Sequence, residues 1–442
     1  MGKYSKTIEI DIKKKYIFPE IIRLIHYKSK IIVISVETAC WIVLDNVNQL
    51  SFFNLLKTYT IQDAIELFKG SQADVQSVLI QIEARKFESK QVNRTPYKQL
   101  QIYLTNQCNL RCPHCYMYAN NARNNELSTD EIKYIFKEFH KSGGENVILT
   151  GGEISLRKDL IEIIKCANNI GLKIELLSNG TLWSDSDINT IAPLISRIQI
   201  SIDGFSEENN SKVRGKGNFQ KALETIDKFI TKNTPVEIAI TPLYNDNLKN
   251  EYIQYAHFGK FMKNKYRDYN LKIKYTTSLL DGRDLNLSLS QKEEYRIIMN
   301  KVQELYYNED ITDYPFINSH KRRIIFDNCA FGCMNISSIG EVYACSVIPK
   351  LQAIGNIRKE PFKDILEKLN RARNFSNINN LQPCKQCELK YICGGGCRII
   401  FFNGFTDYED TKINVSPERK CDENIKHEFY ELMIRTNHFL FE

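Results

Sequence analysis

Three cysteines stand close together in the first third of the chain, at Cys108, Cys112 and Cys115, with the spacing C-x3-C-x2-C. Three thiolates on one short loop can hold three corners of a cubane iron–sulfur cluster. The fourth iron then has no protein ligand, so a substrate or cofactor can complete its coordination, as at an open catalytic zinc. The alternative is a structural zinc site whose fourth ligand comes from elsewhere. His114 is a poor candidate for that ligand, because its ring shares a tight loop with Cys115.

Eight more cysteines lie near the C-terminus, and four of them follow the unbroken spacing C-x2-C-x5-C-x3-C. Eight thiolates are enough for two four-thiolate sites, which could hold two cubane clusters or two structural zinc ions. A run of three glycines at 394–396 would let the chain wrap tightly around such a site. The eight are Cys329, Cys333, Cys345, Cys384, Cys387, Cys393, Cys397 and Cys421.

The sequence indicates a protein of a reducing compartment, where clustered cysteines bind metal. No stretch of the 442 residues approaches the ~20 apolar residues of a membrane span. The first 15 residues are charged and lack the apolar core of a signal peptide. We therefore expect a cytoplasmic protein, in which clustered cysteines bind metal rather than form disulfides. The remaining two cysteines, Cys40 and Cys166, stand alone and read as ordinary core residues.

The net charge of +7 does not indicate a nucleic-acid-binding protein. Its 60 basic residues are interspersed with 53 acidic ones, so the sequence has no strongly basic patch. We expect neither a nucleic-acid partner nor a membrane partner.

The middle of the chain, residues 98–280, alternates apolar strand patterns with helical ones. Repeated strand–helix units predict a parallel sheet covered by helices. Six units are too few for an eight-fold barrel, so the expected fold is α/β, a partial (β/α)6 barrel. Its site should lie at the C-terminal ends of the strands. The strands are expected at 98–105, 146–150, 172–177, 197–202, 236–241 and 271–275.

Two smaller regions flank this barrel. In residues 1–97, apolar segments at 15–18, 21–27, 30–36 and 40–44 precede three helical patterns, which predicts a winged-helix-like module of three strands and three helices. The polar residues 88–97 read as its linker. Residues 281–442 begin with a helix near 291–307 and continue as a cysteine-rich region, organised by metal rather than by a large core.

In three of its motifs the chain resembles a known family, the radical S-adenosylmethionine (SAM) superfamily. The first cysteine group matches its signature, and the Gly-Gly-Glu at 151–153 and the Ser-Ile-Asp-Gly at 201–204 match its later motifs. The resemblance implies that SAM chelates the open iron and is cleaved to a 5′-deoxyadenosyl radical, which abstracts a hydrogen atom. The sequence departs from the usual pattern at Asn210 and Ser211, where many relatives carry His-Asp. The implied SAM-binding residues are His114, Tyr116, Gly151, Gly152, Glu153, Ser178, Ser201 and Arg214; no residue is assigned as catalytic.

Residues 325–425 resemble the iron–sulfur domain of radical SAM enzymes known as SPASM. The resemblance implies two auxiliary [4Fe–4S] clusters and therefore three clusters in all. The first auxiliary cluster would be held by Cys329, Cys333, Cys345 and Cys397. The second would be held by Cys384, Cys387, Cys393 and Cys421.

The N-terminal module resembles the peptide-recognition domain of radical SAM peptide maturases. The implied partners are a precursor peptide, whose leader adds a strand to the module's sheet, and an external flavodoxin- or ferredoxin-like electron donor. The expected reaction is a thioether or carbon–carbon cross-link. Formylglycine formation is not expected, because Ser346 stands where that branch carries an Asp base. The alternatives are radical modification of a folded protein or small metabolite, and a non-catalytic iron–sulfur or zinc scaffold.

Overall fold

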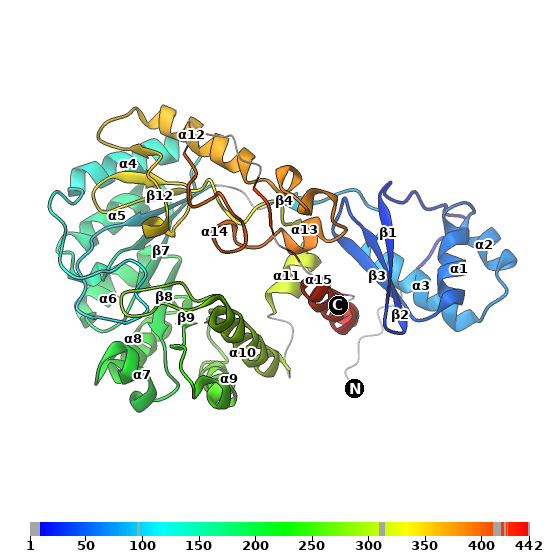
Figure 1. Ribbon diagram of the computed structural model, residues 1–442, viewed down its shortest axis with the longest axis horizontal. Helices are drawn as coiled ribbons and strands as arrows, with labels where there is room; N and C mark the ends of the chain where they lie inside the picture. The colour runs from blue at the N-terminus through cyan, green and yellow to red at the C-terminus, as the bar shows by residue number, and fades with distance from the viewer. Residues whose placement is uncertain are drawn as a thin grey trace.

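The largest element of the fold is a nine-stranded sheet (Figure 1). The computed structural model describes residues 9–94, 98–308, 314–409, 417–419, 421 and 423–440. Six neighbouring strands are parallel, as the sequence predicts, and confirm the α/β class. They are β5 (Gln99–Tyr103), β6 (Asn146–Thr150), β7 (Lys173–Ser178), β8 (Arg197–Ile202), β9 (Val236–Ile240) and β10 (Leu271–Tyr275).

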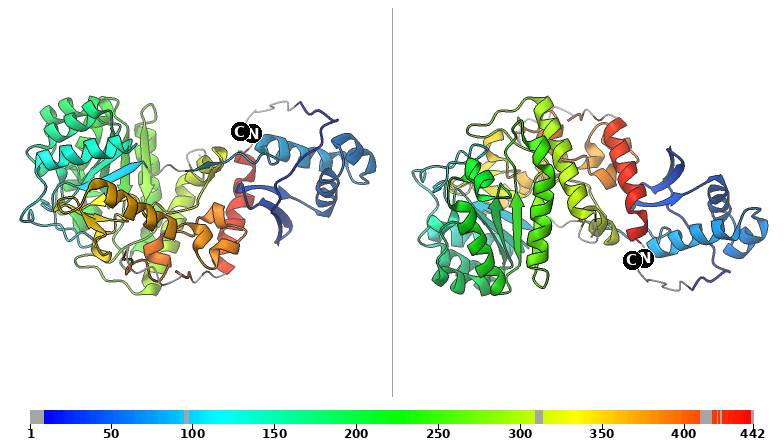
Figure 2. Two further views of the ribbon diagram at one scale, coloured as in Figure 1. Left: turned by 90° about the horizontal axis from the view of Figure 1, so that it is seen from above. Right: turned by 90° about the horizontal axis from the view of Figure 1, so that it is seen from below.

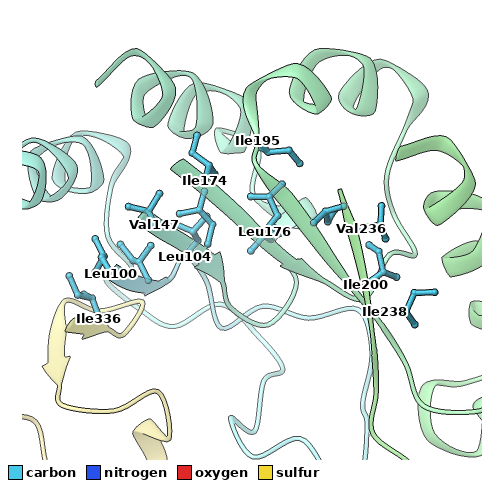
Figure 3. Close-up of a cluster of buried hydrophobic side chains, with 14 of the residues drawn as sticks. Leu100, Leu104, Val147, Ile174, Leu176, Ile195, Ile200, Val236, Ile238 and Ile336 are labelled. Carbon is cyan, nitrogen blue, oxygen red and sulfur yellow. The ribbon is translucent and has the colours of Figure 1, made fainter. Parts of the chain in front are cut away.

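The sheet continues beyond the six expected strands. From the C-terminal region, β12 (Met334–Ile336) pairs parallel to β5, and β13 (Glu341–Tyr343) and β14 (Gly355–Asn356) follow antiparallel. The six expected parallel strands are thus present, and three short strands that the sequence does not predict extend their sheet. Strands of two or three residues are too short to give a periodic signal. Ile336 packs among the same apolar side chains as Leu100 and Val147 (Figure 3), so both regions share one core.

Helices that connect these strands cover the sheet. The first of them begins with a capping box, in which Ser128 and Glu131 exchange hydrogen bonds across the first turn. Four of its apolar residues face the sheet and are buried. The helices are α4 (Thr129–Lys141), α5 (Leu160–Ile170), α6 (Asp185–Ile191), α7 (Glu207–Arg214), α8 (Asn218–Thr231), α9 (Leu248–Lys265) and α10 (Leu289–Tyr307).

The N-terminal region has its own antiparallel sheet, in the order β1-β2-β3, from β1 (Ile22–Tyr27), β2 (Lys30–Ser35) and β3 (Cys40–Leu44). Residues 15–18 form no strand. One face of the sheet packs on α1 (Val47–Leu56), α2 (Ile61–Leu67) and α3 (Gln72–Arg85). The other face packs on C-terminal elements, which explains why all five residues of β3 are buried.

Among the C-terminal elements, α11 (Pro315–Lys321), α13 (Lys390–Cys393) and α15 (Glu423–Thr436) lie between the N-terminal sheet and the barrel (Figure 1), with α15 next to the sheet (Figure 2). The expected linker is bonded to the C-terminal region. The strand β4 (Asn93–Arg94) pairs with β11 (Ile324–Ile325), and the Arg323 side chain donates hydrogen bonds to the backbone carbonyls of Ser89 and Gln91 in the linker. Linker residues 95–97 lie outside the described part. The remaining helices are α12 (Phe362–Phe375) and α14 (Arg398–Phe401). None of the described helices is long and apolar enough to cross a membrane.

Candidate active site and metal centres

The first cysteine group opens onto a cavity of about 330 Å³ at the C-terminal ends of the parallel strands. Cys108, Cys112 and Cys115 follow β5 and line this cavity. The structure brings to the same cavity every SAM-binding residue expected from the sequence except Glu153. These are His114, Tyr116, Gly151, Gly152, Ser178, Ser201 and Arg214.

Two glycines let the loop after β6 lie against the cysteine loop. A Cβ on Gly151 would stand 2.5 Å from the Thr105 carbonyl oxygen, and one on Gly152 would stand 2.2 Å from that of Gln107. Both distances are far below van der Waals contact, so neither position accepts a side chain without moving backbone. Gly152 N also donates to Thr105 O at 2.8 Å. The pair thus fixes the spacing between the two loops.

Glu153 stands behind the cavity wall. Its side chain is fully buried and accepts hydrogen bonds from Ser178 Oγ and from the Asn179 backbone N–H, both at 2.7 Å. Ser155 also donates to it, at 2.8 Å. In this arrangement Glu153 braces the loop after β7, and it is not among the groups that face the cavity.

The cationic side of the cavity is organised by Asp203, which the sequence analysis did not assign to the site. Its Oδ2 lies 2.6 Å from Arg214 Nε and 3.4 Å from His114 Nε2. Its backbone N–H donates to Asn210 Oδ1 at 2.9 Å, which gives a role to the residue that departs from the family pattern. Burial lowers the pKa of His114, against the opposing charge of Asp203. His114 is therefore neutral near pH 7 in the chain without ligands.

The cysteine loop is also held in place by Gly282 and Arg283, which lie in the segment after β10, the last parallel strand. Arg283 donates from its backbone N–H to Cys115 O at 3.3 Å and from its side chain to Cys112 O at 3.4 Å. A Cβ on Gly282 would stand 2.4 Å from the carbonyl carbon of His114. Sequence reasoning missed this clamp. Its only signal was a Gly-Arg-Asp tripeptide between a strand and a helix.

The donor set fits an iron–sulfur cluster with one open iron. Three thiols share one wall, and burial raises the pKa of Cys112 to about 11. Binding iron requires thiolates, so loading this site must release protons. The remaining space lies beside polar groups and Arg214, which suits a ligand that is itself polar and charged.

The four cysteines expected at the first auxiliary site are also neighbours. Burial raises the pKa of Cys345 to about 12, and the nearby Cys329 and Cys397 add to that rise. Burial raises the pKa of Cys333 to about 11, and the nearby Cys329 adds to that rise. The adjoining residue, Ser346, accepts a hydrogen bond at its carbonyl from Tyr103, whose hydroxyl lies 3.2 Å from that of Tyr116. The first auxiliary site is thus connected to the large cavity through two tyrosines.

The second auxiliary site is a separate, small cavity of about 20 Å³. All four cysteines expected there line it: Cys384, Cys387, Cys393 and Cys421. Burial raises the pKa of Cys387 to about 12. Leu389 and Ile392 beside the site belong to the apolar cluster that packs on the N-terminal sheet. Two of the residues that flank Cys421 in sequence, 420 and 422, lie outside the described part.

Residues 102–256 match the Radical SAM superfamily, and residues 328–388 match SPASM, an iron-sulfur cluster-binding domain. Together with the site geometry, these matches define the protein class: a radical SAM enzyme with an auxiliary iron–sulfur domain. The chain belongs to the radical SAM superfamily, whose members bind SAM and iron–sulfur clusters.

Three similar proteins extend this result. An AdoMet-dependent heme synthase of Methanosarcina barkeri is 28% identical over 330 residues, which is 69% of this chain and 92% of the relative. The sporulation killing factor maturation protein SkfB of Bacillus subtilis is 33% identical over 142 residues, which is 32% of this chain and 34% of the relative. The solved structure of native anSMEcpe with bound AdoMet and Cp18Cys peptide has the same fold. It has a TM-score of 0.54 and 20% identity, covering 78% of this chain and 98% of that one.

Proposed function

We propose that this protein modifies a ribosomally made precursor peptide by radical SAM chemistry, forming a thioether or carbon–carbon cross-link. The main observation in support is the large cavity, which is lined by three cysteines, Arg214 and His114. It has room for more than a cluster. The maturation role in the name of SkfB and the peptide bound to anSMEcpe support a peptide substrate. Three [4Fe–4S] clusters, on the ligand sets given above, belong to the proposal, as does an external flavodoxin- or ferredoxin-like electron donor.

The residues of this chain have distinct tasks in the proposed reaction. When bound, SAM and its cluster would supply a 5′-deoxyadenosyl radical that takes one hydrogen atom from the peptide. Closing the cross-link would release one proton and one electron, and an auxiliary cluster would accept that electron. Arg214, kept in place by Asp203, would bind the carboxylate of SAM. Gly151 and Gly152 let the ligand approach the backbone closely, while Glu153 holds Ser178 in position. Tyr103 and Tyr116 lie on the side of the cavity toward the first auxiliary site.

We assign leader recognition to the N-terminal sheet, and within it to the outer edge of β1. The edge of β3 is already taken: Gln81 Nε2 donates to Val43 O and Gln81 Oε1 accepts from Val43 N, both at 2.8 Å. The register of β1 with β2 turns the backbone groups of Leu24 and His26 outward. Among the described residues, no backbone partner bonds to them there. A free edge of this kind is what an extended peptide needs to add as a strand.

A proline substitution tests this edge. Leu24→Pro removes an outward N–H without touching the bonds to β2, and proline is tolerated at such edge positions. We expect weaker binding of the leader peptide, measured by fluorescence anisotropy, with unchanged SAM cleavage. Leu24→Ala, which keeps the N–H, is the matched control. Equal affinity of the two variants would exclude β1 as the binding edge.

The reaction itself is tested with reconstituted full-length protein under anaerobic conditions. With SAM, a reductant and a peptide encoded beside the gene, we expect 5′-deoxyadenosine and a peptide lighter by two hydrogen atoms. An unchanged peptide mass would contradict the proposal. Metal analysis distinguishes the proposed enzyme from a zinc scaffold, because three cubane clusters require about twelve irons per chain.

The heme synthase relative supports a second candidate, modification of a small tetrapyrrole. The match covers 92% of that relative, far more than the match to SkfB. Anaerobic incubation with SAM and iron tetrapyrrole precursors of heme distinguishes the candidates: a changed tetrapyrrole mass favours the tetrapyrrole, and an unchanged mass favours the peptide. Modification of a folded protein is the remaining alternative, and it would proceed without any leader segment.

A further inference from the structure

Arg419 lies inside the second auxiliary site. It lines the small cavity with the four cysteines and is only 5% exposed. Its Nη1 donates to Cys393 Sγ at 3.6 Å and to the Gly395 carbonyl at 2.6 Å. Its guanidinium carbon lies 4.9 Å from the centre of the Phe401 ring. These contacts fix the guanidinium against the thiol wall of the cavity.

No carboxylate of the described residues pairs with this charge. Across the residues that the structure describes, no ion pair involves Arg419, and its buried Nε has no hydrogen-bond partner. The neighbouring cation of the same cavity, Lys426, differs in this respect. Its Nζ lies 3.5 Å from Glu388 Oε1 and 3.3 Å from Glu423 Oε1. A buried cation without a counter-charge is strongly unfavourable, so a compensating anion is expected beside Arg419.

The four cysteines provide that anion when they hold a cluster. Four thiolates outweigh the positive charge of a cubane core, so the ligated cluster is negatively charged. Reduction adds one more negative charge. A nearby buried cation therefore favours the reduced form, and an N–H donated to a ligating sulfur acts in the same direction.

We propose that Arg419 is the counter-ion of the second auxiliary cluster and raises the reduction potential of that cluster. This inference depends on the ligand set in the proposed function. It makes Arg419 a positioning residue that acts through the cluster rather than on substrate. It also implies that the cavity favours an anionic occupant and that the folded chain is less stable without one.

The test compares Arg419→Gln with wild type, in the apo chain and after anaerobic loading with iron and sulfide. Without metal, we expect the variant to unfold at the same temperature as wild type or higher, because an unbalanced buried charge is gone. With metal, we expect it to unfold at a lower temperature. We also expect a lower midpoint potential in an EPR-monitored titration. Lys385→Gln is the matched control, since it removes an exposed positive charge next to Cys384 and should change neither quantity.

Two results would overturn the inference. A purely structural arginine would destabilise apo and loaded chains equally when replaced, and an unchanged midpoint potential would exclude the electrostatic role. If Arg419→Gln does not fold, Arg419→Lys keeps the charge and should keep a potential close to wild type; a potential far below it would contradict the proposal. The ligand set is tested separately: a Cys384→Ala/Cys387→Ala double variant that keeps its full iron content would refute the site itself.

Discussion

The first cysteine site and the second auxiliary site use buried arginines in opposite ways. In the large cavity, Arg214 is paired with Asp203 at 2.6 Å. In the small cavity, Arg419 has no carboxylate partner among the described residues. The volumes differ as well, about 330 Å³ against about 20 Å³. A cation that serves an exchangeable ligand needs a permanent partner for the time when that ligand is absent. A cation that serves a resident cluster does not.

The largest expected effect comes from removing the thiols of one site at a time. The triple variant Cys108→Ala, Cys112→Ala, Cys115→Ala should lose all SAM cleavage, because no open iron remains to bind SAM. The Cys384→Ala/Cys387→Ala variant should instead lose about four irons per chain and keep SAM cleavage. Chromatographic assay of 5′-deoxyadenosine and iron analysis measure both. Persistent SAM cleavage in the triple variant would break the distinction between the two sites.

The sequence predicts the parts of these sites that depend on local chain geometry. The six parallel strands and the cysteine and glycine motifs could be found in this way, since cysteine spacing and Gly151-Gly152 are constraints within a few residues. The partners of these motifs could not. Asp203 meets His114 only because the loops after β5 and β8 converge, and Arg283 reaches Cys112 across 171 positions of sequence.

Glu153 illustrates the same limit from the other side. A Gly-Gly-Glu motif is compatible with a carboxylate that faces a ligand or with one that faces the protein. The structure has the carboxylate bonded to Ser178 and Asn179. Only the position of the loop after β7 distinguishes these cases, and that position is a property of the assembled sheet. The extra strand β12 has the same origin, because three residues acquire strand geometry only beside β5.

An intermediate effect is expected from Asp203→Asn, which removes the permanent partner of Arg214. The arginine loses its orientation, so we expect the KM for SAM to rise about tenfold, the size of one charge-assisted hydrogen bond. Iron content should stay at the wild-type level. Asp130→Asn is the control, since its side chain is 96% exposed and is not among the residues that line the cavity. An unchanged KM would mean that Arg214 needs no partner, and the contrast with Arg419 would fail.

The smallest expected effect concerns the apolar cluster between the N-terminal sheet and the second auxiliary site. His320 is buried there against Trp41 and Phe316, with ring centroids 4.6 and 4.4 Å away. Burial, together with a smaller effect of the charge of Arg85, lowers the pKa of His320 to about 3. The folded chain therefore resists protonation, while the unfolded chain takes up a proton near pH 6.5. Stability should be complete above that pH and decline as the pH falls from 6.5 toward 3.

Between pH 7.5 and 5.5 the wild-type chain should lose about 1.4 kcal/mol of unfolding free energy through this one group. His320→Phe keeps the ring contacts and removes the titration, so its loss over the same interval should be smaller by that amount. Urea unfolding of the metal-free chain at both pH values measures the difference. His140→Gln, on an exposed helix end, should leave the wild-type slope unchanged. If the unfolding free energy of wild type and of His320→Phe changes equally between the two pH values, water reaches His320 in the folded chain. Arg419 would then be less well shielded from water than its burial indicates.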